Sequence, residues 1–372
     1  MVRTMFAGAY QGRRVLVTGH TGFKGAWLAR WLVQLGAKVA GYALPPPTDP
    51  SLFAALDWED RLDHSLGDVR DAAALAALIT RLQPEVVFHL AAQPLVRRSY
   101  AEPVETFATN VLGTVHLLEA VRRQGGPCAV VVVTSDKCYE ETEGLRERRE
   151  EDPVGGRDPY SASKACAEIA AAAYARSFFQ KNERLALATA RAGNVIGGGD
   201  WAEDRIMPDC MRALRAGRPI PVRRPDAVRP WQHVLEPLSG YLWLGARLWR
   251  TISAGQTKPS SAYNFGPSPE SHRQVRALVD EVLRHWPGRW EQVSAAGDPH
   301  ENECLRLSID RAARELGWRP VWDFPTAVER TVRWYRAFPG EKRAIVADLV
   351  DADIEAYVQA ARRRGLPWME ES

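Results

Sequence analysis

Buried strands of the parallel-sheet kind are the feature that most restricts how this chain folds. Residues 130–133 read VVVV, and RRVLVTG (13–19), KVAGYAL (38–44) and VVFHLAA (86–92) are likewise apolar without regular polar alternation. Such runs indicate strands that are covered on both faces. Because helical segments separate them, we expect a parallel sheet with right-handed crossover connections.

The helical segments lie between these strands, at residues 23–36, 71–83, 104–124 and 160–179. After about residue 190 the alternation fades, and segments such as YNFGPSPE are typical of loops, while residues 271–286 indicate one more helix. We therefore predict an α/β protein with a doubly wound parallel (Rossmann) sheet in residues 1–190. Residues 191–372 are expected to form mainly a smaller α/β substrate-binding lobe, some segments of which could rejoin the first domain.

The charge balance excludes several classes of function. The chain has 49 Lys and Arg against 46 Asp and Glu, a net charge of +3, without the basic stripe that nucleic acid requires. The densest charge run, RERREED at 146–152, mixes signs and predicts a solvated loop. No apolar run approaches the roughly 18–20 residues of a membrane helix, and MVRTMFAGAY lacks the apolar core of a signal peptide. We expect a cytoplasmic protein with no nucleic-acid or membrane partner.

The cysteines point to the same compartment. They number five, at positions 128, 138, 166, 210 and 304, and none forms a CxxC pair, so we expect reduced thiols. His, Glu and Cys crowd together only in HENEC (300–304), which has no matching second set of ligands elsewhere. We interpret HENEC as a surface turn and expect no metal.

A glycine-rich turn follows the first strand. It reads TGHTGFKG, with Gly19, Gly22 and Gly25 placed between an apolar strand and an amphipathic helix. Glycine in this position allows a sharp turn and close approach to a pyrophosphate, so the pattern predicts a dinucleotide site. The second strand ends in Gly41 and Tyr42 without an acidic or basic neighbour. The missing basic residue favours NAD, and NADP stays the alternative.

Two further motifs contain reactive side chains. The valine strand runs directly into Ser135, Asp136 and Lys137, at the carboxyl end where α/β sheets bind ligands. YSASK places Tyr160 and Lys164 four residues apart, on one face of a helix. A helix cap with a solvated ion pair would also account for the Ser-Asp-Lys segment.

Together, the glycine turn and YxxxK resemble the short-chain dehydrogenase/reductase family. Within it, TGHTGFKGAWL, VTSDKCYE, DPYSASKACAE, RAGNVIGGGDW and RPWQHVLEPLSGYLWL are similar to the extended-type group of CDP-glucose 4,6-dehydratases. This resemblance implies bound NAD and a CDP-glucose substrate, converted to CDP-4-dehydro-6-deoxyglucose. The cofactor residues that we assign are Gly19, Gly22, Phe23, Lys24, Gly25, Asp68, Val69, Ala91, Ala92, Gln93, Asn110, Tyr160 and Lys164.

The resemblance also implies a role for each reactive side chain. Tyr160 would remove the C4 hydroxyl proton, and Lys164 would stabilise the phenolate that this requires. Ser135 would hydrogen-bond the C4 oxygen, Asp136 would protonate the departing C6 hydroxyl, and Lys137 would take the place of the C5 base. A lysine can act as a base only where burial or a neighbouring cation lowers its pKa.

The substrate and the assembly complete these expectations. Asn194, Arg205 and Arg229 match positions that contact the diphosphate in related dehydratases, although a surface role is an equal alternative for Arg205. The resemblance implies a homo-oligomer, in which the helices at 104–124 and 160–179 could pack against a second subunit. Three alternatives stay open: a dehydratase for another nucleotide sugar, a 4-epimerase, and an inactive nucleotide-binding protein.

Overall fold

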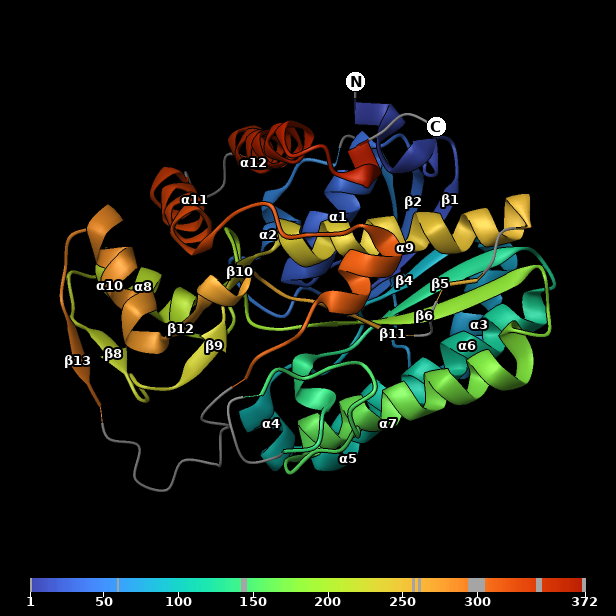
Figure 1. Cartoon of the computed structure of the whole chain (residues 1–372), viewed down its shortest axis with the longest axis horizontal. Coiled ribbons are helices and arrows are strands. Elements are labelled where there is room, and N and C mark those ends of the chain that lie inside the picture. Colours follow the sequence, from blue (N-terminus) through green and yellow to red (C-terminus); the bar gives the residue numbers. More distant parts are fainter. Residues whose placement is uncertain are drawn as a thin grey trace.

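A seven-stranded sheet forms the centre of the molecule. The computed structural model describes residues 2–58, 60–141, 146–255, 258–259, 262–293, 305–338 and 343–369. The strand order is β11-β6-β5-β4-β1-β2-β3, and every neighbouring pair is parallel (Figure 1). The predicted parallel α/β sheet is therefore confirmed. Its strands are β1 (Arg14–Thr18), β2 (Lys38–Ala43), β3 (Leu62–Leu66), β4 (Val86–His89), β5 (Cys128–Val133), β6 (Leu185–Ala192) and β11 (Ala262–Phe265).

Helices cover both faces of this sheet, as the valine run predicts. Val131 and Val133 of β5 belong to the core on one face, and Val130 and Val132 belong to the core on the other. The first core includes α1 (Phe23–Gln34) and α9 (Leu235–Ala254), and the second includes α3 (Ala72–Leu82), α6 (Gly113–Gln124) and α7 (Pro159–Tyr174). Because each buried valine contributes about 1.5–3 kcal/mol, the doubly wound arrangement follows directly from the run.

Three elements of the sheet and its cover were not predicted from the sequence. β3 reads LDHSL and is partly exposed at the sheet edge, so it lacks the apolar pattern of its neighbours. β11 has only four residues and lies in a segment that we expected to be a loop. α9 is buried along most of its length, which removes the polar stripe that marks an amphipathic helix.

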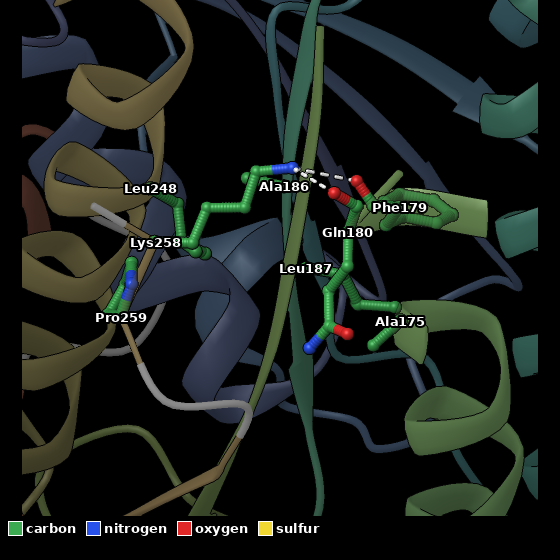
Figure 2. A pocket seen from close by; sticks show the side chains of 8 residues that line it. All are labelled: Ala175, Phe179, Gln180, Ala186, Leu187, Leu248, Lys258 and Pro259. Carbon is green, nitrogen blue, oxygen red and sulfur yellow. Dashed lines mark hydrogen bonds between the residues drawn. The ribbon is translucent and has the colours of Figure 1, made fainter. Parts of the chain in front are cut away.

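The helices that were predicted as single units contain irregular turns. Residues 104–124 form α5 (Pro103–Phe107), a π-helical turn (Ala108–Leu112) and then α6. A second π-helical turn (Ala175–Phe179) continues α7. Lys258 donates from Nζ to the backbone oxygens of Phe179, at 2.8 Å, and of Gln180, at 3.5 Å (Figure 2). A third bond, to the backbone oxygen of Asn182 at 3.0 Å, completes the cap of this end. Such π turns often occur at functional sites, and Asn110 lies in the first of them.

The remaining helices and short strands form a smaller lobe and a terminal cover (Figure 1). β8 pairs with β13, β9 with β12, and β7 with β10. The predicted helix at 271–286 begins four residues later, as α10. The elements are α2 (Leu52–Ala55), α4 (Val96–Ala101), β7 (Val195–Ile196), α8 (Ile206–Arg215), β8 (Ile220–Val222), β9 (Val228–Pro230), β10 (Gln232–His233), β12 (His272–Gln274), α10 (Val275–His285), β13 (Trp290–Gln292), α11 (Phe324–Ala337) and α12 (Arg343–Arg363).

The two ends of the chain meet beside α1 (Figure 1). The rings of Phe6 and Trp368 stack with their centroids 5.1 Å apart, and both side chains are fully buried. Trp31 of α1 contacts the Phe6 ring edge-on, with 5.8 Å between the centroids. Arg30 of α1 and Asp351 of α12 form an ion pair, with 2.5 Å between Nη2 and Oδ2. Within the described part of the chain, no helix combines the length and apolarity needed to cross a membrane.

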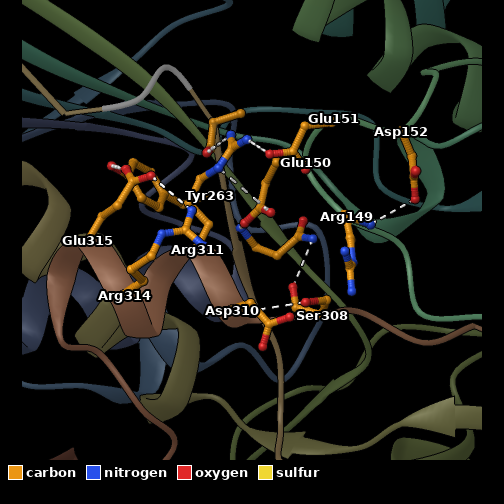
Figure 3. A network of polar contacts seen from close by, with 12 residues as sticks. Arg149, Glu150, Glu151, Asp152, Tyr263, Ser308, Asp310, Arg311, Arg314 and Glu315 are labelled. Atoms are coloured by element: carbon orange, nitrogen blue, oxygen red, sulfur yellow. Dashed lines mark hydrogen bonds and ion pairs between the residues drawn. The ribbon is translucent and has the colours of Figure 1, made fainter.

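The charge run at 146–152 is not the fully solvated loop that we predicted. Glu150 is buried and accepts a hydrogen bond from the backbone N–H of Asn264 at 2.8 Å. Arg311 pairs with the neighbouring Glu151 (Figure 3). The mixed charges therefore attach this loop to β11 and to the segment that follows residue 305.

Candidate functional site

The glycine turn between β1 and α1 lies against the turn that follows β4. Gly19 has a positive φ of 77°, and a Cβ atom there would lie 2.7 Å from the backbone N of Ala91. A Cβ on Gly25 would lie 2.1 Å from the backbone oxygen of Gly19. Gly22 is the N-cap of α1 and offers no side chain to cap the helix. Only glycine permits this packing, which leaves the amino end of α1 open to an anion such as a pyrophosphate.

The glycine turn after β1 contains His20, which the sequence did not single out and which contacts both β2 and β3. The His20 ring lies over Gly41, where a Cβ would be 2.4 Å from the ring, and its Nε2 is 2.7 Å from His64 Nδ1. Burial and the neighbouring His64 lower the pKa of His20 to about 3. The predicted Asp68 is ion-paired with Arg70, 2.6 Å between Oδ2 and Nη2, and this bond lowers the pKa of its carboxyl.

Asn110 joins the turn after β4 to α7. Its Oδ1 accepts from the backbone N of Gln93 at 2.8 Å, and its Nδ2 donates to the Gln93 oxygen at 3.1 Å and to Ser163 Oγ at 2.8 Å. Ser163 in turn donates to the backbone oxygen of Tyr160 at 2.7 Å. The structure therefore places Asn110 and Gln93 behind the first turn of α7, where they fix its position.

The five predicted catalytic side chains come from two neighbouring elements. Ser135 follows β5, Asp136 and Lys137 lie in the 3-10 turn Asp136–Cys138, and Tyr160 and Lys164 lie one turn apart on α7. Ser135 Oγ donates to Asp136 Oδ1 at 3.1 Å and accepts from the Lys137 backbone N at 3.2 Å. Lys164 Nζ is 3.4 Å from the backbone oxygen of Val133.

Burial changes the pKa values in this group. It raises the pKa of Tyr160 to about 12, although a hydrogen bond with Ser135 opposes the rise. It lowers the pKa of Lys164 to about 8 and raises the pKa of Asp136 above its ordinary value. Asp136 Oδ2 is buried without a hydrogen-bond partner among the residues that the structure describes. Shifted pKa values of this kind are typical of reactive sites.

The smaller lobe and α1 supply cations to the same place. Arg229 of β9 is buried, and its charge favours the ionised form of Asp136, as does that of Lys24. Arg205 pairs with Asp200, 3.0 Å between Nη1 and Oδ2, and acts electrostatically on Tyr160 and on Lys24. Burial and the charge of Arg205 lower the pKa of Lys24 to about 7.

The other predicted residues lie around this group. Asn194 is half-buried just before β7, and its backbone oxygen accepts from the Gln232 backbone N at 3.1 Å. Val69 is buried, with its backbone oxygen 3.1 Å from His116 Nδ1, and the Ala91 backbone N donates to Thr18 Oγ1 at 3.3 Å. Phe23, the first residue of α1, and Ala92, in the turn after β4, are partly buried.

Besides His20, sequence reasoning missed other side chains at this site, among them Tyr241 and Glu168. Tyr241 of α9 is fully buried, its hydroxyl has no partner among the described residues, and Lys24 Nζ lies 5.9 Å from its ring centroid. Glu168 follows Lys164 by one helical turn and is buried. The spacing K-x-x-x-E could have indicated Glu168, whereas no local pattern marks Tyr241.

The metal and thiol predictions are tested only in part. Among the described residues, no group of three or more His, Cys, Asp or Glu side chains is placed to hold a metal ion. HENEC (300–304) lies outside the described residues. Cys128, Cys138, Cys166 and Cys210 are free, and Cys304 also falls outside the described part.

Comparison with known proteins gives a consistent result. Residues 15–250 match the NAD dependent epimerase/dehydratase family. The CDP-glucose 4,6-dehydratase of Salmonella typhimurium is 46% identical over 361 residues, which cover 95% of this chain and 98% of that protein. The dTDP-glucose 4,6-dehydratase of Streptomyces antibioticus is 30% identical, with 87% and 92% covered. The solved structure of DesIV, a dTDP-glucose 4,6-dehydratase from Streptomyces venezuelae with NAD and TYD bound, superposes with a TM-score of 0.73 at 27% identity, covering 89% of this chain and 99% of that one.

Proposed function

Because the chain belongs to the NAD dependent epimerase/dehydratase family, we propose that it converts CDP-glucose to CDP-4-dehydro-6-deoxyglucose. The observation that carries this proposal is the convergence of Ser135, Asp136, Tyr160 and Lys164 at one end of the sheet, beside the glycine turn. The relative with 46% identity supports the choice of CDP-glucose.

The residues of the first domain fit the NAD that the family requires. Gly19 and Gly25 leave no room for a side chain, so their backbone and the amino end of α1 can approach a diphosphate. NAD bound there would supply the hydride acceptor for oxidation at C4 and, once reduced, the hydride donor for C6. Asn110 and Gln93 hold the turn after β4 in register with α7 and so shape the other side of the cofactor site.

Tyr160 removes the proton from the C4 hydroxyl in the oxidation step. Burial opposes the phenolate, since it raises the pKa of Tyr160 to about 12. We assign the ammonium of Lys164, one turn further along the same helix, the role of offsetting this effect. Ser135 completes the group by hydrogen-bonding the C4 oxygen, which keeps the reacting proton directed at the phenol.

Asp136 and Lys137 serve the elimination of water across C5 and C6. A 4-ketone acidifies the C5 proton, so a base must remove this proton while an acid protonates the departing C6 hydroxyl. Burial raises the pKa of Asp136, which suits a carboxyl group that holds a proton until the hydroxyl leaves. Lys137 is half-buried in the same 3-10 turn and is the base that we assign to C5.

The diphosphate of the substrate is assigned to Asn194, Arg205 and Arg229. Arg229 acts electrostatically on Asp136 and Arg205 on Lys24, and guanidinium groups pair well with phosphate oxygens. Arg205 already pairs with Asp200. It can therefore contribute to binding only if its guanidinium contacts the diphosphate and Asp200 at the same time.

Two copies of the chain are proposed to pair through α5, α6, α7 and the π turns that adjoin them. The exposed apolar side chains of this surface are Val104, Phe107, Leu112, Ile169 and Phe178. An apolar group of this size outside a core is typical of a subunit interface. The four cysteines among the described residues are free thiols, which supports the cytoplasm, where thiols stay reduced, as the place of action.

The test is turnover of nucleotide sugars by the purified protein with added NAD. CDP-glucose is expected to lose water and give a 4-keto-6-deoxy product, measured by the absorbance of the ketone in alkali and by mass spectrometry. Product from dTDP- or GDP-sugars alone would show that the substrate contains a different nucleotide. A 4-epimer formed without loss of water would identify an epimerase. Binding of NAD without any turnover would identify an inactive nucleotide-binding protein.

A further inference from the structure

Glu168 is a buried carboxylate directly behind the proposed catalytic group. It is 4% exposed and lies on α7, one turn after Lys164 and two turns after Tyr160. Its Oε2 accepts from Thr189 Oγ1 at 2.7 Å and from Arg191 Nη2 at 2.8 Å, and its Oε1 accepts from Thr134 Oγ1. Thr134 immediately precedes Ser135, so one side chain joins α7 to both β6 and the reactive turn.

Arg191, which forms an ion pair with Glu168, also makes hydrogen bonds to other elements. It is buried, and its Nη1 donates to Tyr139 OH at 2.8 Å and to the Glu150 backbone oxygen at 3.3 Å. Tyr139 OH donates to Asn264 Oδ1 at 2.7 Å. A buried ion pair of this kind seldom stabilises a fold more than apolar residues of the same size would. Its position next to Lys164 therefore asks for another explanation.

The charged and titratable groups around Lys164 give that explanation. Lys24 of α1 and His89 of β4 face it from the sheet side, Cys138 from the 3-10 turn, and Tyr160 and Glu168 from α7. Burial lowers the pKa of Lys164 to about 8, and Glu168 is the main group that opposes this effect. Neither neighbour on the sheet side supplies negative charge, because Lys24 is a base and His89 is neutral, with its pKa lowered to about 3.

We propose that Glu168 is a positioning residue that keeps Lys164 protonated and holds the Thr134–Ser135 segment against α7. This inference rests on the proposed function, because it gives the ammonium of Lys164 its purpose. Glu168 itself does not touch the substrate. It acts through Lys164, whose charge makes the Tyr160 phenolate accessible, and through Thr134, which sets where Ser135 lies.

The experiment separates charge from shape with four variants of the full chain, studied with NAD. Glu168→Gln keeps the shape and removes the charge, whereas Glu168→Asp keeps the charge and shortens the reach. Thr189→Val is the matched control, because it breaks one of the same hydrogen bonds without changing any charge. Glu168→Gln combined with Arg191→Met leaves no unpaired buried ion, so a folded protein is expected even if the single variant does not fold.

Two readouts are measured between pH 6 and 10. The first is the alkaline limb of kcat for 4-keto product, and the second is the titration of Lys164 itself, obtained from competitive acetylation and peptide mass spectrometry without turnover. Loss of the carboxylate is expected to move both midpoints to lower pH by about one unit in Glu168→Gln. The double variant is expected to shift them in the same direction by less, because Arg191→Met also removes a positive charge. Thr189→Val and Glu168→Asp are expected to leave both midpoints in place, whatever their effect on kcat.

Unmoved midpoints in both charge-removing variants would overturn the inference. A purely structural Glu168 would lower the melting temperature and the amount of active protein without moving either midpoint. The acetylation readout also distinguishes the two proposals. A wild-type protein that forms no ketone contradicts the proposed function, while the titration of Lys164 still decides the role of Glu168.

Discussion

Two buried carboxyl groups, Glu236 and Asp136, show how differently this chain uses the same chemistry. Glu236 is completely buried in the first turn of α9, and its oxygens accept from the backbone N–H groups of Val321 and Trp322 at 2.8 and 2.7 Å and from Tyr357 OH at 2.8 Å. Asp136 is also buried, but its Oδ1 accepts from Ser135 Oγ, and its Oδ2 has no partner among the described residues.

This difference separates a structural role from a proposed reactive one. The donors to Glu236 come from residues 321–322 and from α12, so this carboxylate fastens the C-terminal part of the chain to α9. Ser239 extends the cluster, since it accepts from Trp318 Nε1 at 2.9 Å and lies 3.0 Å from Tyr357 OH. A buried carboxyl group whose oxygens all have hydrogen-bond partners supports the fold. A buried carboxyl oxygen without a protein donor is available to a ligand.

The largest effect is expected from changes at Asp136, whose hydrogen bonds are incomplete, and at the neighbouring Tyr160. Asp136→Asn should lower the rate of water loss by about 10²–10⁴-fold, the usual contribution of a positioned acid, while the 4-keto sugar still forms. Tyr160→Phe should stop the reaction earlier, before the ketone. Rapid-quench analysis of the sugar products distinguishes the two blocks, and normal turnover by Tyr160→Phe would remove the mechanism.

Replacement of Lys164, whose ammonium lies in the same group as Asp136, sharpens the comparison. It is expected to stabilise the protein and to abolish turnover. The pKa of Lys164 is lowered from 10.5 to about 8, so the buried charge destabilises the fold below pH 8, and this effect is relieved as the pH rises from 8 to 10.5. Lys164→Met should therefore raise the free energy of unfolding at pH 7 by about 3 kcal/mol. Denaturant titrations at pH 7 and pH 10 measure this gain, which should shrink at the higher pH. A destabilised variant at pH 7 would show that Lys164 has a structural role.

The smallest effect is expected at Glu236, whose hydrogen-bond partners are all present. Its replacement should lower stability and leave kcat unchanged. Glu236→Gln directs an amide N–H₂ toward groups that are themselves donors, so at least one buried donor loses its acceptor. The free energy of unfolding should fall by about 1–3 kcal/mol, while kcat per folded molecule stays unchanged. Thermal unfolding and kcat normalised to folded protein test this, and a loss of kcat without a loss of stability would break the comparison with Asp136.

The parts of the fold that could be predicted are those whose signals are local. The valine run of β5, the glycine turn before α1 and the YSASK segment of α7 each specify their element within a few residues. β11 could not be recognised, because its four residues become a strand only by pairing with β6. α9 was not predicted because burial along most of its length leaves no polar stripe.

The same distinction applies to the candidate site. Ser135, Asp136, Tyr160 and Lys164 were found from motifs, and the structure brings them together at the carboxyl end of β5. His20, Tyr241 and Arg191 were missed, because their relevance comes from partners that are distant in the sequence. Arg191, for example, contacts Tyr139 and Glu168, which lie on different elements.

The late return of the chain to the sheet has a consequence for biosynthesis. β11 closes the edge beside β6, and α9 covers the face that includes Val131, Val133 and Ala188. A nascent chain that has only reached residue 190 therefore carries an apolar surface without its final cover. Maturation of the nucleotide-binding half must wait until residues 235–265 have left the ribosome, and a protein shortened before that point would expose a surface prone to aggregation.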